Sequence, residues 1–112
     1  MIKSILLHLS MNMWEDIGLD EVLKRHPKFP KLCYNRVWSD KLRCDDGVWD
    51  RTVEAFAGAG GNMLIIDIGD GIRWKSHPEI SVEGAWSPDR LKSKLARCRA
   101  LGVEPIPKIN FS

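Results

Sequence analysis

Residues 87–111, SPDRLKSKLARCRALGVEPIPKINF, contain the pattern that decides the fold. The leading Ser-Pro-Asp supplies a helix N-cap, a proline at the first helical position and an acid in the first turn. An apolar stripe with helical spacing follows, and Gly102 ends it because glycine tolerates the left-handed position after a helix. An apolar, strand-like segment begins directly afterwards. The stretch therefore predicts a helix that turns into a buried strand with almost no loop.

The same unit occurs once earlier in the chain, and a further strand precedes it. Asp45 or Asp46 can cap a helix that Gly60 and Gly61 end, and NMLIIDIG follows as a strand. Strands that alternate with amphipathic helices favour a parallel sheet. We predict one α/β domain, 1–112, of order β-α-β-α-β. Its predicted strands are about 3–13, 62–69 and 103–111, and its predicted helices are about 46–59 and 88–101.

Polar residues gather at one end of the predicted strands. The helix-to-strand connections are tight, whereas the strand-to-helix loops, about 14–45 and about 70–86, are long. Because side chains alternate along a strand, His8, Asp67 and Lys108 share the parity opposite to the apolar residues near the carboxyl ends. Long loops over inward-facing polar residues are typical of the active-site end of a (β/α)8 barrel. We therefore predict the first part of such a TIM barrel, incomplete at the C-terminus.

Composition excludes several classes of partner. The net charge of +2 and the absence of a dense Lys/Arg run argue against nucleic acid. The apolar run 5–9 near the N-terminus is too short for a signal peptide or a membrane span and is interrupted by His8. Three cysteines without a CxxC pair favour reduced thiols and a cytoplasmic location. We predict no metal site and no cofactor.

Residues 100–112, ALGVEPIPKINFS, resemble a strand segment of β-N-acetylhexosaminidase-type (family 20-like) glycoside hydrolases, in which G-(I/V)-E-x-I-P leads into the substrate pocket. The resemblance extends over about 46–112 and only loosely over the first 45 residues. It implies a carbohydrate-metabolising hydrolase, with the catalytic acids beyond residue 112. Lys108 departs from the family, which usually carries an acid at that position. The matching positions are Gly102, Glu104, Ile106 and Pro107.

The resemblance also implies which residues bind sugar at the strand ends. Carboxylates, imidazole and amide groups would hydrogen-bond to sugar hydroxyls, and tryptophan rings would stack on the sugar. Structural roles stay open: Asp67 could pair with Lys108, and SHPEI, residues 76–80, could be a structured loop only. The candidate substrate-binding residues are Asp67, Asp70, His77, Glu79, Asn110, Trp14 and Trp74.

We expect a glycosidase-like fragment that binds carbohydrate and is inactive alone, because strand 103–111 ends where a fourth βα unit should follow. Exposed sheet edges would then allow self-association. A non-enzymatic carbohydrate-binding or assembly module is the alternative. An actin-like nucleotide-binding fold, suggested by LIIDIGDG at 64–71, is less favoured because a long loop and a helix follow this stretch.

Overall fold

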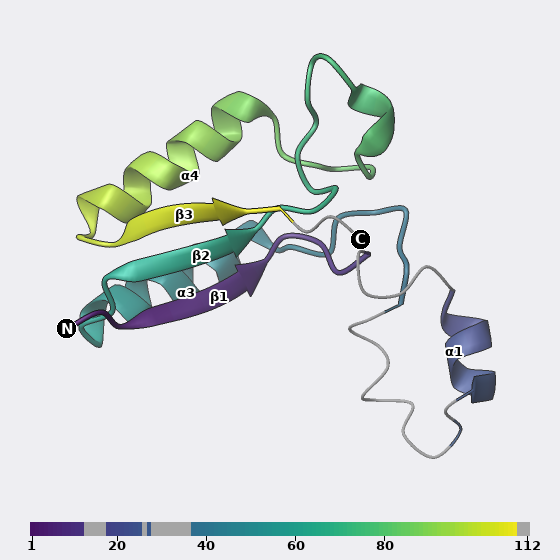
Figure 1. Cartoon of the computed structure of the whole chain (residues 1–112), viewed down its shortest axis with the longest axis horizontal. Coiled ribbons are helices and arrows are strands. Elements are labelled where there is room, and N and C mark those ends of the chain that lie inside the picture. The colour runs from purple at the N-terminus through teal and green to yellow at the C-terminus, as the bar shows by residue number, and fades with distance from the viewer. Residues whose placement is uncertain (13–17, 26, 28–36, 110–112) are drawn as a thin grey trace.

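The computed structural model describes residues 1–12, 18–25, 27 and 37–109. Within them, β1 (Ser4–His8), β2 (Met63–Asp67) and β3 (Glu104–Lys108) form a parallel three-stranded sheet in the order β1-β2-β3 (Figure 1). Helices α3 (Asp46–Gly58) and α4 (Pro88–Ala100) alternate with these strands. The predicted parallel β-α-β-α-β arrangement is confirmed, and the sheet of the described residues does not close into a barrel.

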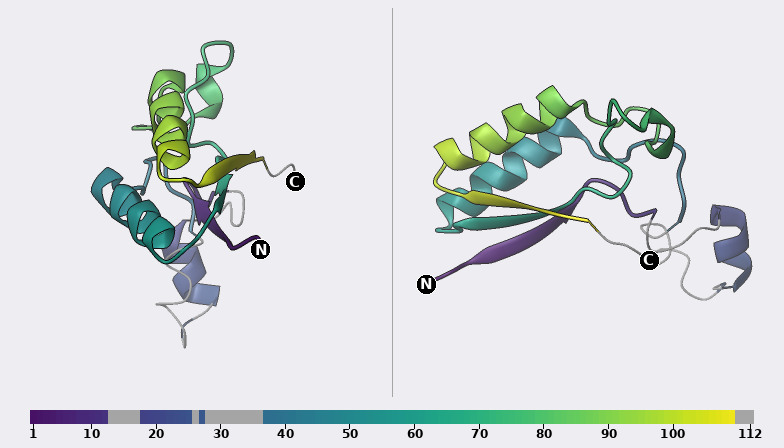
Figure 2. Two further views of the ribbon diagram at one scale, coloured as in Figure 1. Left: turned by 90° about the vertical axis from the view of Figure 1, so that its left-hand side faces the viewer. Right: turned by 45° about the horizontal axis from the view of Figure 1, so that its top comes forward.

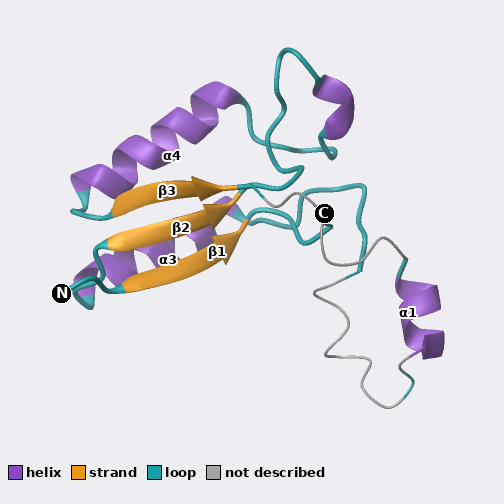
Figure 3. Ribbon diagram, viewed as in Figure 1, coloured by secondary structure: helices purple, strands orange, loops and turns teal. Residues whose placement is uncertain are grey.

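Both long helices cover the same face of the sheet (Figure 2). Two shorter elements, α1 (Leu19–Arg25) and the 3-10 helix η1 (Pro78–Ile80), lie in the two long loops that follow β1 and β2 (Figure 3). The sequence pattern did not predict either of them. The opposite face of the sheet carries no helix among the described elements, so within the described residues the sheet has one helix-covered face and one open face.

The helix boundaries follow from local capping. The Ser87 side chain accepts a hydrogen bond from the Arg90 backbone N–H at 3.1 Å, and Asp45 accepts one from the Val48 N–H at 2.8 Å. Gly102, just past α4, adopts a φ of 76° that few other residues tolerate. At Gly61 a Cβ would lie 2.2 Å from the Phe56 ring, so a larger residue there would require this ring to move. These turns keep the helix-to-strand connections short.

The core lies between the sheet and its two helices. Leu64 and Ile66 of β2 are fully buried, and their register partners on β1 and β3 face the same way. The alternate apolar residues that the sequence pattern assigned to one side of each strand therefore lie on the helix-covered face. The buried cluster comprises Leu9, Trp49, Val53, Leu64, Ile66, Ile68, Ile72, Trp86, Leu91, Cys98 and Val103.

Helix α3 also contacts α4 and Trp86, which lies in the loop just before α4. The Trp49 and Trp86 rings meet edge to face, with centroids 5.2 Å apart. Lys94 lies over the Trp86 ring, and its Nζ is 2.7 Å from Asp50 Oδ1. Three further ion pairs join the helices: Arg90 and Lys94 each pair with Asp46, and Arg97 pairs with Glu54.

The strands are shorter than predicted. In place of the expected strands 3–13, 62–69 and 103–111, the structure has five-residue strands at 4–8, 63–67 and 104–108. Positions 13, 110 and 111 of the expected strands lie outside the described residues. The central strand ends because the chain turns at Gly69, whose φ is 43°, and the Gly71 N–H bonds back to the Ile68 carbonyl. Once β2 has turned away, its neighbours have no strand to pair with. The sequence remains apolar beyond this point, but the regular pairing between the strands ends.

The two long loops are joined to each other at the carboxyl ends of the strands. Leu42 N–H bonds to the Glu83 carbonyl at 2.8 Å, and Glu83 N–H bonds to the Asp40 carbonyl at 2.8 Å. Within the second loop, Trp86 N–H bonds to the Gly71 carbonyl at 2.8 Å. The loops therefore form one connected layer above the strand ends.

Ile66→Ala tests the packed face. Ile66 is fully buried in the central strand, so we expect the substitution to lower the free energy of unfolding by about 2–5 kcal/mol. Chemical denaturation followed by circular dichroism measures the change. Ile80→Ala is the matched control, because Ile80 is 57% exposed and should change stability by less than about 0.5 kcal/mol. Equal effects of the two substitutions would contradict the proposed core.

Candidate functional site

The open face of the sheet carries two rows of side chains in register across all three strands. Leu6 pairs with Ile65, which pairs with Ile106; one step towards the carboxyl ends, His8 pairs with Asp67, which pairs with Lys108. Leu6 and Ile106 are 43% and 40% exposed. The face thus has an apolar row and, next to the long loops, a charged row. The shared parity of His8, Asp67 and Lys108 predicted from the sequence is confirmed.

Asp67 is the centre of the charged row. Its side chain is 1% exposed, and its Oδ2 lies 3.0 Å from Lys108 Nζ and 3.3 Å from His8 Nδ1. A buried carboxylate is costly unless it is paired, and these two side chains supply that pairing. The predicted alternative, that Asp67 pairs with Lys108 across adjacent strands, is therefore confirmed. His8 and Lys108 are both partly exposed, so they form the solvent-facing part of the row.

Asp70 belongs to a separate network that holds the loops. Asn12 Nδ2 donates to Asp70 Oδ2 at 2.9 Å and to the Ser39 carbonyl at 2.7 Å. The Ser39 N–H donates to Asn12 Oδ1 at 2.8 Å. The Asn12 amide thus joins the end of the β1 segment to both long loops. This geometry gives Asp70 a structural role in positioning the loops.

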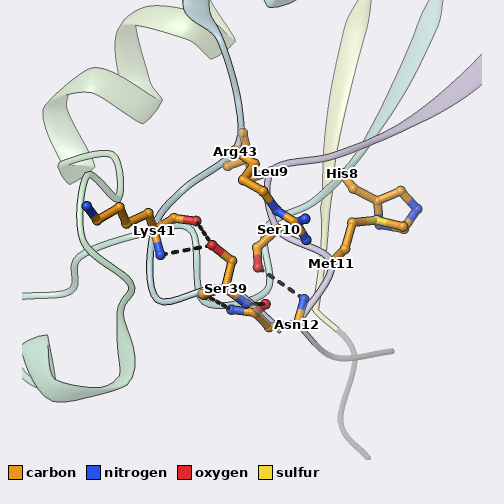
Figure 4. Close-up of a pocket in the computed structure, with 8 residues that line it drawn as sticks. All are labelled: His8, Leu9, Ser10, Met11, Asn12, Ser39, Lys41 and Arg43. Atoms are coloured by element: carbon orange, nitrogen blue, oxygen red, sulfur yellow. Dashed lines mark hydrogen bonds between the residues drawn. The ribbon is translucent and has the colours of Figure 1, made fainter. Parts of the chain in front are cut away.

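A hollow of about 270 Å³ opens beside the end of β1 (Figure 4). It lies between the chain that follows β1 and the loop segment that leads into α3. His8 belongs both to this hollow and to the charged row, so the two features are continuous. The lining residues are His8, Leu9, Ser10, Met11, Asn12, Ser39, Lys41 and Arg43.

The other predicted site residues lie in different places. His77 lies just before η1, and Glu79 lies within it. Both side chains are about two-thirds exposed, and they contact each other at 3.0 Å. Backbone hydrogen bonding, and then the His77 ring, lower the pKa of Glu79. Trp74 lines a second hollow of about 250 Å³ together with Pro78 and Pro88. None of the three is among the lining residues of the hollow beside β1. Trp14 and Asn110 lie outside the described residues.

Sequence reasoning missed Arg43, Ser39 and the hollow they line. These residues lie in the loop predicted as about 14–45, where no strand or helix period indicates which side chains point inward. The only available signal was the excess of basic residues between 41 and 43, which is too short to distinguish from an ordinary surface.

Burial raises the pKa of the Cys44 thiol, so the thiol is protonated at neutral pH and is a weak nucleophile. The described residues include no group of three or more His, Cys, Asp or Glu side chains that could hold a metal ion. Among the same residues, no helix is both long and apolar enough to cross a bilayer.

No protein-family model matches this chain, and no curated protein matches it in sequence. The resemblance to family 20-like glycoside hydrolases stays a prediction.

Asn12→Ala tests the loop network. The substitution removes the side chain that satisfies the Ser39 backbone and contacts Asp70, so we expect a loss of about 1–3 kcal/mol in the free energy of unfolding. Thermal or urea denaturation measures it. His77→Gln is the control, because its exposed pair with Glu79 should contribute less than about 1 kcal/mol. A wild-type stability for Asn12→Ala would show that the loops are held by other contacts.

Proposed function

We propose that the chain is part of a glycosidase-like barrel and that it binds carbohydrate at the carboxyl ends of its strands. The observation that carries the proposal is the buried Asp67 carboxylate, which lies between two partly exposed polar side chains on the open face. Parallel α/β folds bind their ligands at this end of the sheet. The joined loops above the strand ends would form the walls of the site.

The charged row suits sugar hydroxyls, which donate and accept hydrogen bonds. Lys108 can donate to a hydroxyl oxygen, whereas the His8 ring can donate or accept according to its tautomer. Asp67 would act mainly by orienting both groups, since it is almost completely buried. The proposal assigns no catalytic acid to these residues. In a glycosidase of this kind, paired carboxyl groups would have to come from elsewhere in the barrel.

Asp67→Asn tests the binding proposal. Removing the charge releases Lys108 and His8 from their shared anchor, so we expect binding of neutral sugars to weaken at least about tenfold. Isothermal titration with N-acetylglucosamine oligomers, glucose and galactose measures the affinity. The measurement is made below the unfolding temperature, because loss of a buried charge also lowers stability.

The matched control is Asp89→Asn, an exposed acid in the first turn of α4 that should leave sugar affinity unchanged. A folded Asp67→Asn variant that binds sugar as the wild type does would contradict the proposed site. Absence of any sugar binding by the wild-type chain would contradict the proposed function itself.

An assembly module is the second candidate, and the apolar row supports it. Leu6 and Ile106 leave about two-fifths of their surface in solvent on the same face, and Ile65 lies between them in register. Burying such a row in a partner or in further strands of a barrel would be favourable at roughly 25 cal/mol per Å².

Leu6→Lys tests whether this face mediates association. A charge within a buried apolar contact is unfavourable, so we expect the wild-type chain to be oligomeric and the variant to be shifted towards monomer in sedimentation velocity. Val48→Lys is the control, since Val48 is 53% exposed but lies on α3, away from the open face. A monomeric wild-type chain at high concentration would contradict the assembly role.

A further inference from the structure

The hollow beside β1 has a biased charge. Three of its eight described lining residues, His8, Lys41 and Arg43, are basic, and none of the eight is Asp or Glu. Two acids outside the lining contact it: Asp70 Oδ2 accepts from Asn12, and Asp67 Oδ2 lies 3.3 Å from His8 Nδ1. A concave site whose lining carries basic but no acidic side chains favours an anionic ligand group.

Arg43 is the basic side chain best placed to act on such a group. Its side chain points towards Ser10 and Met11 within the hollow, whereas the Lys41 side chain extends away from the other lining residues (Figure 4). Arg43 Nη2 donates to the Val37 carbonyl at 2.7 Å, which fixes the direction of the guanidinium. A guanidinium has five N–H donors in a planar fork, a geometry that matches a carboxylate.

The position of the hollow links it to the charged row on the sheet. His8 contacts Asp67 at 3.3 Å and also lines the hollow. A ligand that reached from the row towards Arg43 would therefore pass the His8 side chain. The volume of about 270 Å³ lies just below the range of ordinary ligand pockets, so the hollow suits a substituent of a ligand rather than a whole ligand.

We infer that the site takes an acidic sugar, whose ring lies at the His8–Asp67–Lys108 row and whose carboxylate is bound by Arg43. The inference rests on the proposed carbohydrate-binding function and specifies its ligand class. Ser10, which also lines the hollow, would offer a hydroxyl to the same carboxylate. Neutral sugars would occupy the row alone and would bind more weakly.

The experiment compares matched sugars that differ only at C6. D-Glucuronate and D-galacturonate are titrated against the chain by calorimetry, with D-glucose and D-galactose as the neutral partners. We expect the acidic sugars to bind at least about tenfold more tightly, since a charge-assisted bidentate contact is stronger than a neutral one. Raising the salt concentration should weaken the acidic sugars and leave the neutral ones almost unchanged.

Arg43 variants identify the group responsible. Arg43→Gln should remove the preference for the acidic sugar while retaining neutral binding, and Arg43→Lys should restore only part of the preference because lysine lacks the planar fork. Arg51→Gln, on the exposed surface of α3, is the matched control and should behave as the wild type does. Circular dichroism confirms that each variant is folded.

The outcomes separate this inference from the proposed function. Equal binding of acidic and neutral sugars, both weakened by Asp67→Asn but not by Arg43→Gln, would overturn the inference and leave the carbohydrate site standing. Acetate or glucose 6-sulfate that competes for the Arg43 site as well as glucuronate does would overturn the assignment to a sugar carboxylate. Absence of binding by every sugar would overturn both proposals.

Discussion

The Asp67 carboxylate, buried between Lys108 and His8, is the interaction on which the geometry of the open face depends. Taking an unpaired carboxylate out of water costs several kcal/mol, and two neighbouring strands each contribute one side chain that offsets the cost. A shift of either strand by one residue would turn its contribution to the helix-covered face. The pair of contacts therefore specifies strand register and, with it, the place where a ligand would lie.

Much of the fold could be predicted from the sequence because it depends on local signals. Helices expected at 46–59 and 88–101 occur at 46–58 and 88–100, since their caps are encoded by Asp45 and by the Ser87-Pro88 pair. Strand positions and parity followed from apolar alternation. Strand lengths could not be predicted in this way, because pairing stops where β2 turns at Gly69. The apolar pattern of one strand contains no information about where its neighbour ends.

The site was predictable only where it lies on strands. Asp67 and its two partners share a parity that the sequence displays, so their convergence could be predicted before any coordinates. Asp70, His77 and Arg43 lie in loops, where residues next to each other in sequence can face opposite ways. Their positions depend on contacts between the two long loops, such as those of Asn12, which no periodic pattern indicates.

The ion pairs between α3 and α4 have a consequence for how the molecule assembles itself. The side of each helix that faces the other collects charge of one sign at spacings of three or four residues, and this like-charge repulsion weakens an isolated helix. The self-repulsion disappears when the oppositely charged helix docks beside it, so each helix is more stable in the presence of the other. Folding of the two is thereby coupled, and a peptide of either helix alone should have little helicity in water. The side chains concerned are Asp46, Asp50 and Glu54 on α3 and Arg90, Lys94 and Arg97 on α4.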